Sequence, residues 1–335
     1  MRRMMRKLVA LIIVVTVLLA TQTVHSQATM SITDLGTLGG DYGSAEDIND
    51  RGQVVGGSQT TSGEWHAFLW TKRGGMADLG TLGGSLSDAR GINNRGQVVG
   101  TSTTTSGERH AFLWTKSGGM IDLGTLGGSY SHARDINDRG QVVGFSHTAS
   151  DEEHAFLWTK SVGMVDLGTL GGNDSNAYAI NDHGQAVGHG FTASGEYHAF
   201  LWTKSDGMVD LGTLGGSYSY AWDINNRGQI VGGSSTAWGG YHAILWTKSG
   251  GMIDLGTLGG MSEAHSINDR GQVVGFSEPT SGGHHAFLWT KRSGMADLGT
   301  LGGIDSHAWD ISNRGQVVGS STTALDRQRA CLWTK

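Results

Sequence analysis

Short apolar runs alternate with turn residues along nearly the whole chain, and the alternation repeats about every 44 residues. In the second repeat the runs cover residues 89–93, 97–102, 110–115 and 120–126, with Asn-Arg-Gly, Thr-Ser-Gly and Ser-Gly-Gly between them. No window of helical length shows the 3.6-residue apolar period of an amphipathic helix. The pattern therefore predicts four short strands per repeat and an all-β fold.

The number of repeats narrows the architecture further. The heptapeptide Asp-Leu-Gly-Thr-Leu-Gly-Gly begins at seven positions, which are Asp34, Asp78, Asp122, Asp166, Asp210, Asp254 and Asp297. Four strands in a repeat of this length match a blade of a β-propeller, which is about 40 to 45 residues long in WD-type propellers. Seven blades fall within the usual range of four to eight. The sequence thus predicts a seven-bladed β-propeller over residues 29–335.

The two ends of the repeated region complement one another. The first repeat opens with a strand at 30–38 and lacks a preceding Leu-Trp-Thr-Lys, whereas the last repeat stops at that motif, residues 332–335. One missing strand at one end matches one spare strand at the other. We expect the N-terminal strand to pair beside the C-terminal strand, so that the ring closes and leaves no unpaired blade edge.

The segment before the repeats has a different composition. Arg2, Arg3, Arg6 and Lys7 precede an apolar run at 8–20, and small and polar residues follow at 24–28. This order is typical of a signal peptide, here residues 1–28 with cleavage near 26–28. The apolar run is shorter than the roughly 20 residues that span a bilayer as a helix. We expect a secreted protein without a membrane contact, with a retained N-terminal anchor as the alternative.

Charge and cysteine content exclude several classes of function. Loss of residues 1–28 removes four positive and no negative side chains, which changes the formal charge from −6 to −10. An acidic secreted protein is a poor candidate for nucleic-acid binding. Cys331 is the single cysteine, so no intramolecular disulfide can form. We expect a monomer with no cofactor.

Two further motifs carry a family resemblance. His-Ala-Phe begins at His66 and recurs at His110, His154, His198 and His285, and Ile-Asn-Asp-Arg-Gly-Gln-Val-Val-Gly begins at Ile48. The chain resembles the HAF-family extracellular repeat proteins of bacteria over nearly all of residues 30–335. The resemblance implies a secreted repeat protein with no established chemistry. The seventh repeat departs from it, with Arg329-Ala330-Cys331 in place of the tripeptide.

Metal sites and catalytic motifs find little support in the repeats. The His-Ala-Phe histidines fall on the third strand of different blades, too far apart to share one ion, so we expect them to hydrogen-bond the turns of their blades. The Asp-Ile-Asn-Asp-Arg-Gly segment at 47–52 has the positively charged Arg51 where a calcium-binding loop needs an oxygen ligand. We therefore interpret the segment as a tight turn. The basic ring that these turns create could attract an anion, or it could be a solvated face paired with neighbouring aspartates. No nucleophile motif is present, and Cys331 occupies a phenylalanine slot.

Aromatic residues outside the repeat pattern indicate where a ligand could bind. Seven of the 11 tryptophans occupy one repeated position, whereas the other four and all seven tyrosines do not. Tyr42, Tyr130 and Tyr218 fall in the loop between the fourth and first strands. The others flank the start of the first strand (Tyr178, Tyr220, Trp222 and Trp309) or fall in or end the loop between the second and third strands (Trp65, Tyr197, Trp238 and Tyr241), and these two loops share one face. The candidate ligand-binding residues on this rim are Tyr178, Tyr220, Trp222 and Trp309 with the polar residues His307, His265, His132, Arg134 and Arg90. Filling of gaps between blades is the alternative role.

The function expected from these features is non-catalytic binding or adhesion. Aromatic rings beside polar groups suit stacking on sugars or anchoring a polypeptide, so the expected ligand is an extracellular glycan or a surface protein. One alternative is a propeller enzyme, a glycan hydrolase or lyase, with Asp88, Glu263 and Glu46 as carboxylates at the channel mouth. Another is a structural matrix component.

Overall fold

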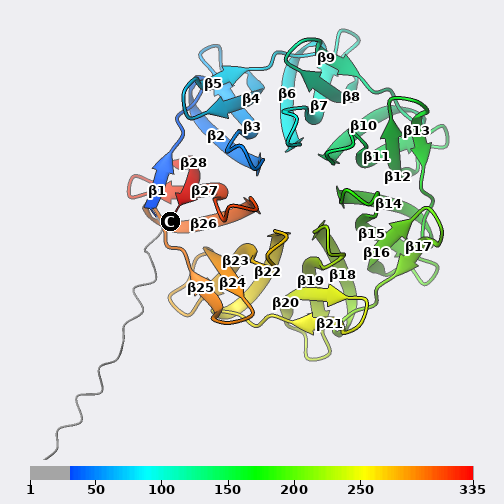
Figure 1. The fold of residues 1–335 in the computed structure, drawn as a ribbon, viewed down its shortest axis with the longest axis vertical. Helices are drawn as coiled ribbons and strands as arrows, with labels where there is room; N and C mark the ends of the chain where they lie inside the picture. Colours follow the sequence, from blue (N-terminus) through cyan, green and yellow to red (C-terminus); the bar gives the residue numbers. More distant parts are fainter. Residues whose placement is uncertain (1–30, 335) are drawn as a thin grey trace, which may run out of the picture.

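The computed structural model describes residues 31–334, and the proposed signal peptide lies outside them. Every regular element in this range is a β-strand. Four strands that follow one another along the chain pair antiparallel with their neighbours in six sets, and in the seventh set three consecutive strands pair with the first strand of the chain (Figure 1). We call each set of four a blade and number the blades 1 to 7 along the chain. The predicted all-β fold of repeated four-stranded sheets is confirmed.

The strands of each class have closely similar lengths. The innermost strands are β2 (Gly39–Ile48), β6 (Gly83–Ile92), β10 (Gly127–Ile136), β14 (Gly171–Ile180), β18 (Gly215–Ile224), β22 (Gly259–Ile267) and β26 (Gly302–Ile311). The second strands are β3 (Val54–Thr60), β7 (Val98–Thr104), β11 (Val142–Thr148), β15 (Ala186–Thr192), β19 (Ile230–Thr236), β23 (Val273–Pro279) and β27 (Val317–Thr323). The third strands are β4 (Trp65–Thr71), β8 (Arg109–Thr115), β12 (Glu153–Thr159), β16 (Tyr197–Thr203), β20 (Tyr241–Thr247), β24 (His285–Thr290) and β28 (Gln328–Thr334). The outer strands are β5 (Gly75–Asp78), β9 (Gly119–Asp122), β13 (Gly163–Asp166), β17 (Gly207–Asp210), β21 (Gly251–Asp254), β25 (Gly294–Asp297) and β1 (Ser31–Asp34).

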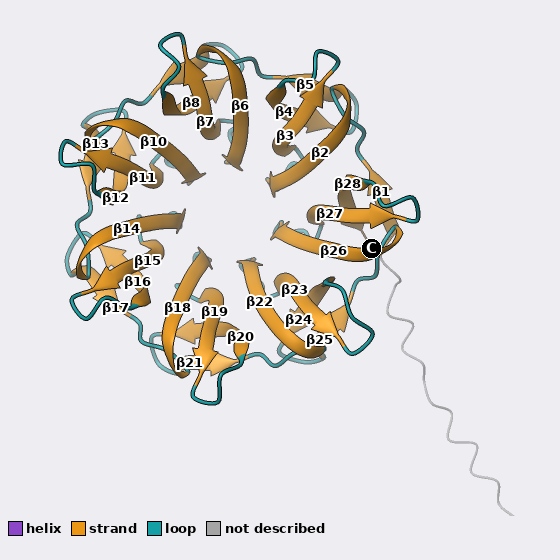
Figure 2. Cartoon of the chain, turned by 180° about the vertical axis from the view of Figure 1, so that it is seen from behind, coloured by secondary structure: helices purple, strands orange, loops and turns teal. Residues whose placement is uncertain are grey.

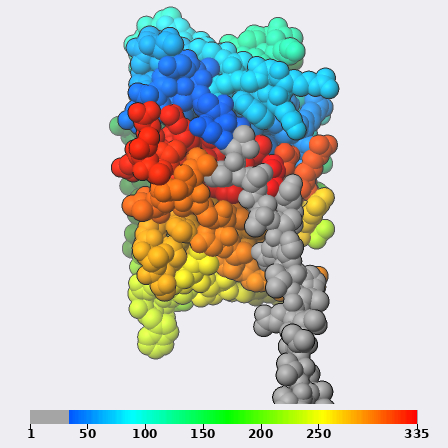
Figure 3. All heavy atoms as spheres, turned by 90° about the vertical axis from the view of Figure 1, so that its left-hand side faces the viewer, coloured from blue at the N-terminus to red at the C-terminus, as the bar shows by residue number. Residues whose placement is uncertain are grey.

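The blades stand around a common axis, with the innermost strands nearest to it (Figures 1 and 2). The hydrogen-bonded ladders make six sheets, because blades 2 and 3 are joined into one eight-stranded sheet by a single parallel bridge between Tyr130 and Arg109. Seen edge-on, the body is a disc (Figure 3). The axis runs between the innermost strands, and many loops lie around the outer rim (Figure 2).

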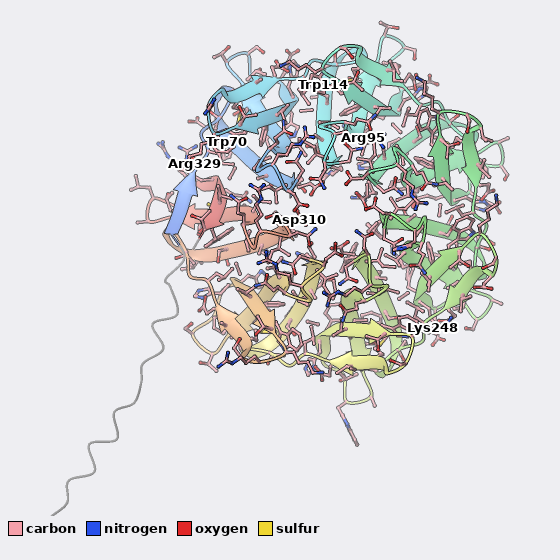
Figure 4. All side chains as sticks on the ribbon, in the orientation of Figure 1. Trp70, Arg95, Trp114, Lys248, Asp310 and Arg329 are labelled. Atoms are coloured by element: carbon pink, nitrogen blue, oxygen red, sulfur yellow. The ribbon has the colours of Figure 1, made fainter. Side chains whose placement is uncertain are left out.

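The chain termini meet in one sheet. β1 lies antiparallel to β28, with Ile32 opposite Trp333 and Asp34 opposite Cys331. In this blade Arg329 replaces the repeated histidine, and its Nε lies 3.7 Å from Asp34 Oδ2 while its Nη1 donates to the Asp41 carbonyl at 2.7 Å (Figure 4). Segments almost 300 residues apart thus form one blade, and its edge strand is β1, as expected from the offset of the repeats.

Hydrophobic residues are buried between the blades. Across one such boundary, Val99 and Leu123 of blade 2 pack with Ile136 and Phe156 of blade 3. The inner and second strands approach so closely that a Cβ on Gly100 would lie 2.0 Å from the Asp88 carbonyl oxygen. The glycine is required here by the packing of the two backbones.

The boundaries of two predicted strands were wrong. The innermost strand begins at the Gly-Gly pair, so Tyr42, Tyr130 and Tyr218 lie within strands and not in loops. The outer strand ends at Asp122 and not at residue 126. The Asp122 carboxylate accepts the Gly124 N–H at 2.8 Å, and Gly124 has a φ of 75°, a conformation that favours glycine and turns the chain toward the next blade.

The repeated histidines stabilise these same turns. Nδ1 of His110 lies 2.7 Å from Oδ2 of Asp122, and five other blades contain the same contact at 2.7 to 2.8 Å. The structural role predicted for these side chains is therefore observed as a bond between the third and outer strands.

Hydrogen bonds between successive inner turns connect all the blades around the axis. The backbone N–H of Asp50 donates to Asn94 Oδ1 at 2.9 Å, and the equivalent bond recurs at each boundary. It also joins the last blade to the first, where the Asn313 N–H donates to Asp50 Oδ1 at 2.9 Å. Within residues 31–334, the predicted pairing of these aspartates with the turn arginines is not found. The aspartate side chains accept backbone N–H groups instead, and Arg95 with its counterparts is exposed (Figure 4).

Candidate functional site

At two positions on the innermost strands the side chain changes from blade to blade, whereas the Gly-Gly pair, the alanine between these positions and the terminal isoleucine recur. The first lies two residues before the terminal isoleucine and holds Glu46, Arg90, Arg134, Tyr178, Trp222, His265 and Trp309. The second lies four residues before it and holds Ser44, Asp88, His132, Asn176, Tyr220, Glu263 and His307. Residues two apart in a strand share one face of the sheet. The structure brings all nine candidate residues to these two positions.

Side chains at the first variable position contact one another across blade boundaries. The ring of Tyr178 meets the indole of Trp222 edge-on, with centroids 4.3 Å apart. His265 stacks on Trp309 at 4.5 Å and 17°, and lies 6.4 Å from Trp222. On the other side of Tyr178, the Arg134 guanidinium carbon is 4.9 Å from its ring centroid. We call this run from Arg134 to Trp309 the variable band.

The carboxylate of Glu263 organises the aromatic part of the band. Its Oε1 accepts hydrogen bonds from the Trp222 indole at 2.7 Å and from the Tyr241 hydroxyl at 2.8 Å. Its Oε2 lies 3.5 Å from Nε2 of His265. Burial alone would raise the pKa of Glu263, but the bonds from His265, Tyr241 and Trp222 hold that pKa below its usual value. Glu263 is therefore an ionised group that fixes three aromatic side chains.

A cavity of about 600 Å³ adjoins this carboxylate. Its walls include Tyr218, Tyr220, Tyr241, Met261 and Glu263. Tyr218 and Tyr241 are stacked at 5.7 Å, and Tyr218 is 40% exposed. The aromatic faces can stack on a sugar ring, and the ionised carboxylate beside them can accept hydrogen bonds from the hydroxyl groups of that sugar.

Sequence reasoning found a third variable position only through its aromatic members Trp65, Tyr197 and Tyr241. The residue before each His-Ala-Phe histidine begins or adjoins the third strand and lies on the same side of the blade as the band; it is Trp65, Arg109, Glu153, Tyr197, Tyr241, His284 or Gln328. Trp65, Tyr197 and Tyr241 are strand residues and not loop residues, contrary to the prediction. A Cβ on Gly233 would lie 2.3 Å from the Tyr241 hydroxyl, so this tyrosine lies across a glycine of the second strand. Comparing each repeat with the others at this position would have revealed the variation.

A smaller cavity of about 240 Å³ lies between blades 2 and 3. Its lining includes Asp88, Arg90, Thr101, Arg109 and His132. We call it the cationic cavity.

The central channel contains a second set of ionisable groups. Asp47, Asp135, Asp223 and Asp310 come from blades 1, 3, 5 and 7 and line the channel beside the inner turns (Figure 4). Burial raises the pKa of Asp135 to about 7 and that of Asp223 to about 6, and for Asp223 the charge of Asp310 adds to the effect. Within residues 31–334, no group of three or more histidine, cysteine or acidic side chains is arranged to hold a metal ion.

The carboxylates considered for catalysis are engaged with other side chains. Glu46 and Asp88 flank Arg90, at 2.8 and 2.7 Å. Burial raises the pKa of Asp88, and the Arg90 charge opposes that increase. Glu263 lies elsewhere, against Trp222 and His265 of the band.

None of the elements in residues 31–334 is a helix long and apolar enough to cross a membrane.

Comparisons with known proteins identify the fold. No protein-family model and no curated protein matches the chain. The propeller domain of the Trilobed protease from Pyrococcus furiosus, described as an open velcro topology, matches with a TM-score of 0.59 and 11% identity over 87% of this chain and 95% of the other. A lectin from Burkholderia pseudomallei matches with a TM-score of 0.53 and 7% identity over 87% and 96%.

A third match concerns a longer protein. TolB from Acinetobacter baumannii is similar with a TM-score of 0.51 and 11% identity over 88% of this chain, which spans 65% of TolB. Identities this low show the fold alone. The shared arrangement of four-stranded blades around an axis makes residues 31–334 a β-propeller.

Proposed function

We propose that this chain is a secreted seven-bladed propeller, closed by β1 on β28, that binds an extracellular glycan or surface protein at the variable band. Ring closure is supported by the antiparallel pairing of the two terminal strands and by the bond from Asn313 to Asp50. Secretion is supported by the charged, apolar and small-residue order of residues 1–28.

The observation that carries the binding proposal is where the variation lies. The repeats keep the same glycines, valines and turn residues, yet the side chains at the two inner-strand positions differ in charge, size and hydrogen bonding. A purely structural repeat would gain by copying one well-packed side chain into every blade. The residues instead form one connected band in which Tyr178 and Trp222 are in contact and both keep part of their surface exposed. Such a lopsided surface on a rigid scaffold suits recognition of one ligand.

Arrays of glycans and extracellular proteins, probed with the exported chain, test this proposal. A captured ligand should bind the Trp222→Ala variant at least about 30-fold more weakly, equivalent to about 2 kcal/mol, because central aromatic anchors contribute that much. Ile253→Ala is the matched control, since Ile253 is exposed on the outer strand of the same blade. Binding that survives Trp222→Ala, or no binding on either array, would contradict the proposal.

A further inference from the structure

Three arginines that are not fully neutralised lie in or beside the cationic cavity: Arg90 and Arg109 line it, and the charge of Arg134 acts on the lining residue His132. Arg90 is paired with Glu46 and Asp88 at 2.8 and 2.7 Å. Arg109 and Arg134 have no carboxylate partner within residues 31–334, although Arg134 is partly buried against Phe145 and Tyr178. Three guanidinium groups against two carboxylates leave one net positive charge. A partly buried guanidinium without a counter-ion is costly, so the site favours one further negative charge.

Polar atoms without partners gather at the same place. Thr101 and His132 are only 7% and 8% exposed, and Thr101 Oγ1 and His132 Nε2 make no hydrogen bond within the described chain. The same holds for Nε of Arg90 and Nε of Arg134. Burial, together with the charges of Arg134, Arg90 and Arg109, keeps the pKa of His132 well below its usual value, so the ring is neutral. Nearly all these atoms can donate a hydrogen bond, which suits a ligand rich in acceptor oxygens.

Arg134 connects the surroundings of the cavity with the aromatic part of the band. Arg134 lies over the Tyr178 ring, which in turn contacts Trp222. The volume of about 240 Å³ is several times the roughly 30 Å³ that one water occupies in the liquid. A group larger than water can therefore enter the cavity, whose own lining contains the aromatic residues Trp65 and Tyr130.

We propose that the cationic cavity binds the carboxylate of an acidic sugar, within a glycan whose neighbouring rings stack on Tyr178 and Trp222. This inference rests on the proposed binding function and names its ligand class. A planar carboxylate matches the donor fork of arginine. Its single charge matches the one net positive charge of the site better than a doubly charged phosphate monoester does. The adjoining rings supply the stacking surface that a sugar needs.

Isothermal titration of the exported chain with uronic-acid oligosaccharides tests the inference. The probes are oligomers of galacturonate, glucuronate, mannuronate and guluronate, each compared with its own methyl ester, which keeps the ring and removes the charge. At least one acid form should bind about tenfold or more tightly than its ester, and added salt should weaken that binding. If every acid binds no better than its ester, the inference is wrong.

Variants locate the effect. Arg134→Gln should weaken binding of the acid form about tenfold or more, while Arg95→Gln, in the exposed turn that follows β6, should leave it unchanged. Should melting show that Arg134→Gln disturbs the fold, exposed Arg109→Gln gives the same test, and unchanged binding in it would overturn the inference.

The outcomes separate this inference from the proposed function. If acid and ester bind equally and Trp222→Ala weakens both, the band binds glycans and the cavity does not recognise the carboxylate. If acidic peptides bind through Arg134 and no uronate does, the ligand class is wrong. If the arrays capture nothing, the proposed function itself fails.

Discussion

The channel aspartates should make the protein less stable as the pH rises from acid to neutral. The Ser266 hydroxyl lies 2.8 Å from Asp223 Oδ2 and 2.5 Å from Asp310 Oδ1. A hydroxyl has one proton, so it can donate to only one of these carboxyl groups and must accept from the other. The two short contacts therefore favour a protonated carboxyl in the channel, in agreement with the raised pKa of Asp223.

The sign of the effect follows from the raised pKa values. Desolvation raises the pKa of Asp135 to about 7, against 3.8 for the free side chain. Between these values the folded state holds a proton that the unfolded state has lost. The stability linked to this group is complete below about pH 4 and is lost as the pH rises through 7.

The size of the effect can be worked from the same shift. A difference of about 3 pKa units corresponds to roughly 4 kcal/mol at 1.36 kcal/mol per unit. Asp135 keeps some contact with solvent in the channel, which screens its charge, so we expect about half of that, ~2 kcal/mol.

Guanidinium unfolding at pH 4 and pH 8, followed by tryptophan fluorescence, measures this difference. The Asp135→Asn variant should lose about 2 kcal/mol of the difference between the two pH values, because it cannot titrate. Asp41→Asn, at an exposed position, should retain the wild-type difference. Groups such as His307, whose pKa burial lowers to about 4, change the stability with pH in the opposite direction. Their contribution is the same in wild type and variant, so it cancels in the comparison. An identical pH dependence in wild type and Asp135→Asn would refute the reasoning.

Three further predictions concern closure, the thiol and the band. A chain lacking residues 27–38 should melt at a markedly lower temperature and aggregate, because β28 loses its partner and the buried Leu35 is removed; an unchanged melting curve would argue against ring closure. Cys331 is fully buried and its pKa is raised to about 12 by burial, so it should resist thiol reagents in the native protein at pH 8, and Cys331→Ala should cost about 1 kcal/mol of stability; rapid labelling would contradict this. Trp309→Ala should weaken binding by about 2 kcal/mol; a loss of roughly 3 kcal/mol in stability with binding intact would show that this indole only fills space between blades.

The repeat made much of the fold predictable. Glycines, valines and turn residues recur at fixed spacing, so the four strands of each blade follow from local pattern alone. The start of the inner strand could not be predicted from the local pattern, because Gly-Gly before Ser or Asp is typical of a loop. Only pairing with the second strand, as between Gly83 and Thr104, makes this segment extended. The same error placed Tyr130 and its counterparts in loops.

Contacts between blades were beyond sequence reasoning for a different physical reason. Glu263 binds Trp222 and Tyr241 from the preceding blade, and Asp50 binds the N–H of Asn313 from the last blade. Spacing along the chain says which residues vary but not which of them meet after the ring forms. The predicted band residues were found because they break the repeat, whereas Glu263 became recognisable as their shared partner only in the structure.

The position of the bound ligand tests the central claim most directly. Hydroxyl-radical footprinting of the exported chain, with and without a ligand captured on the arrays, reports which side chains the ligand covers. We expect protection of Tyr178, Tyr220 and Trp222 and unchanged labelling of the exposed outer-strand residues Val209 and Ile253. Protection confined to the outer strands or to the inner turns around Asp50, with the band still labelled, would contradict the account.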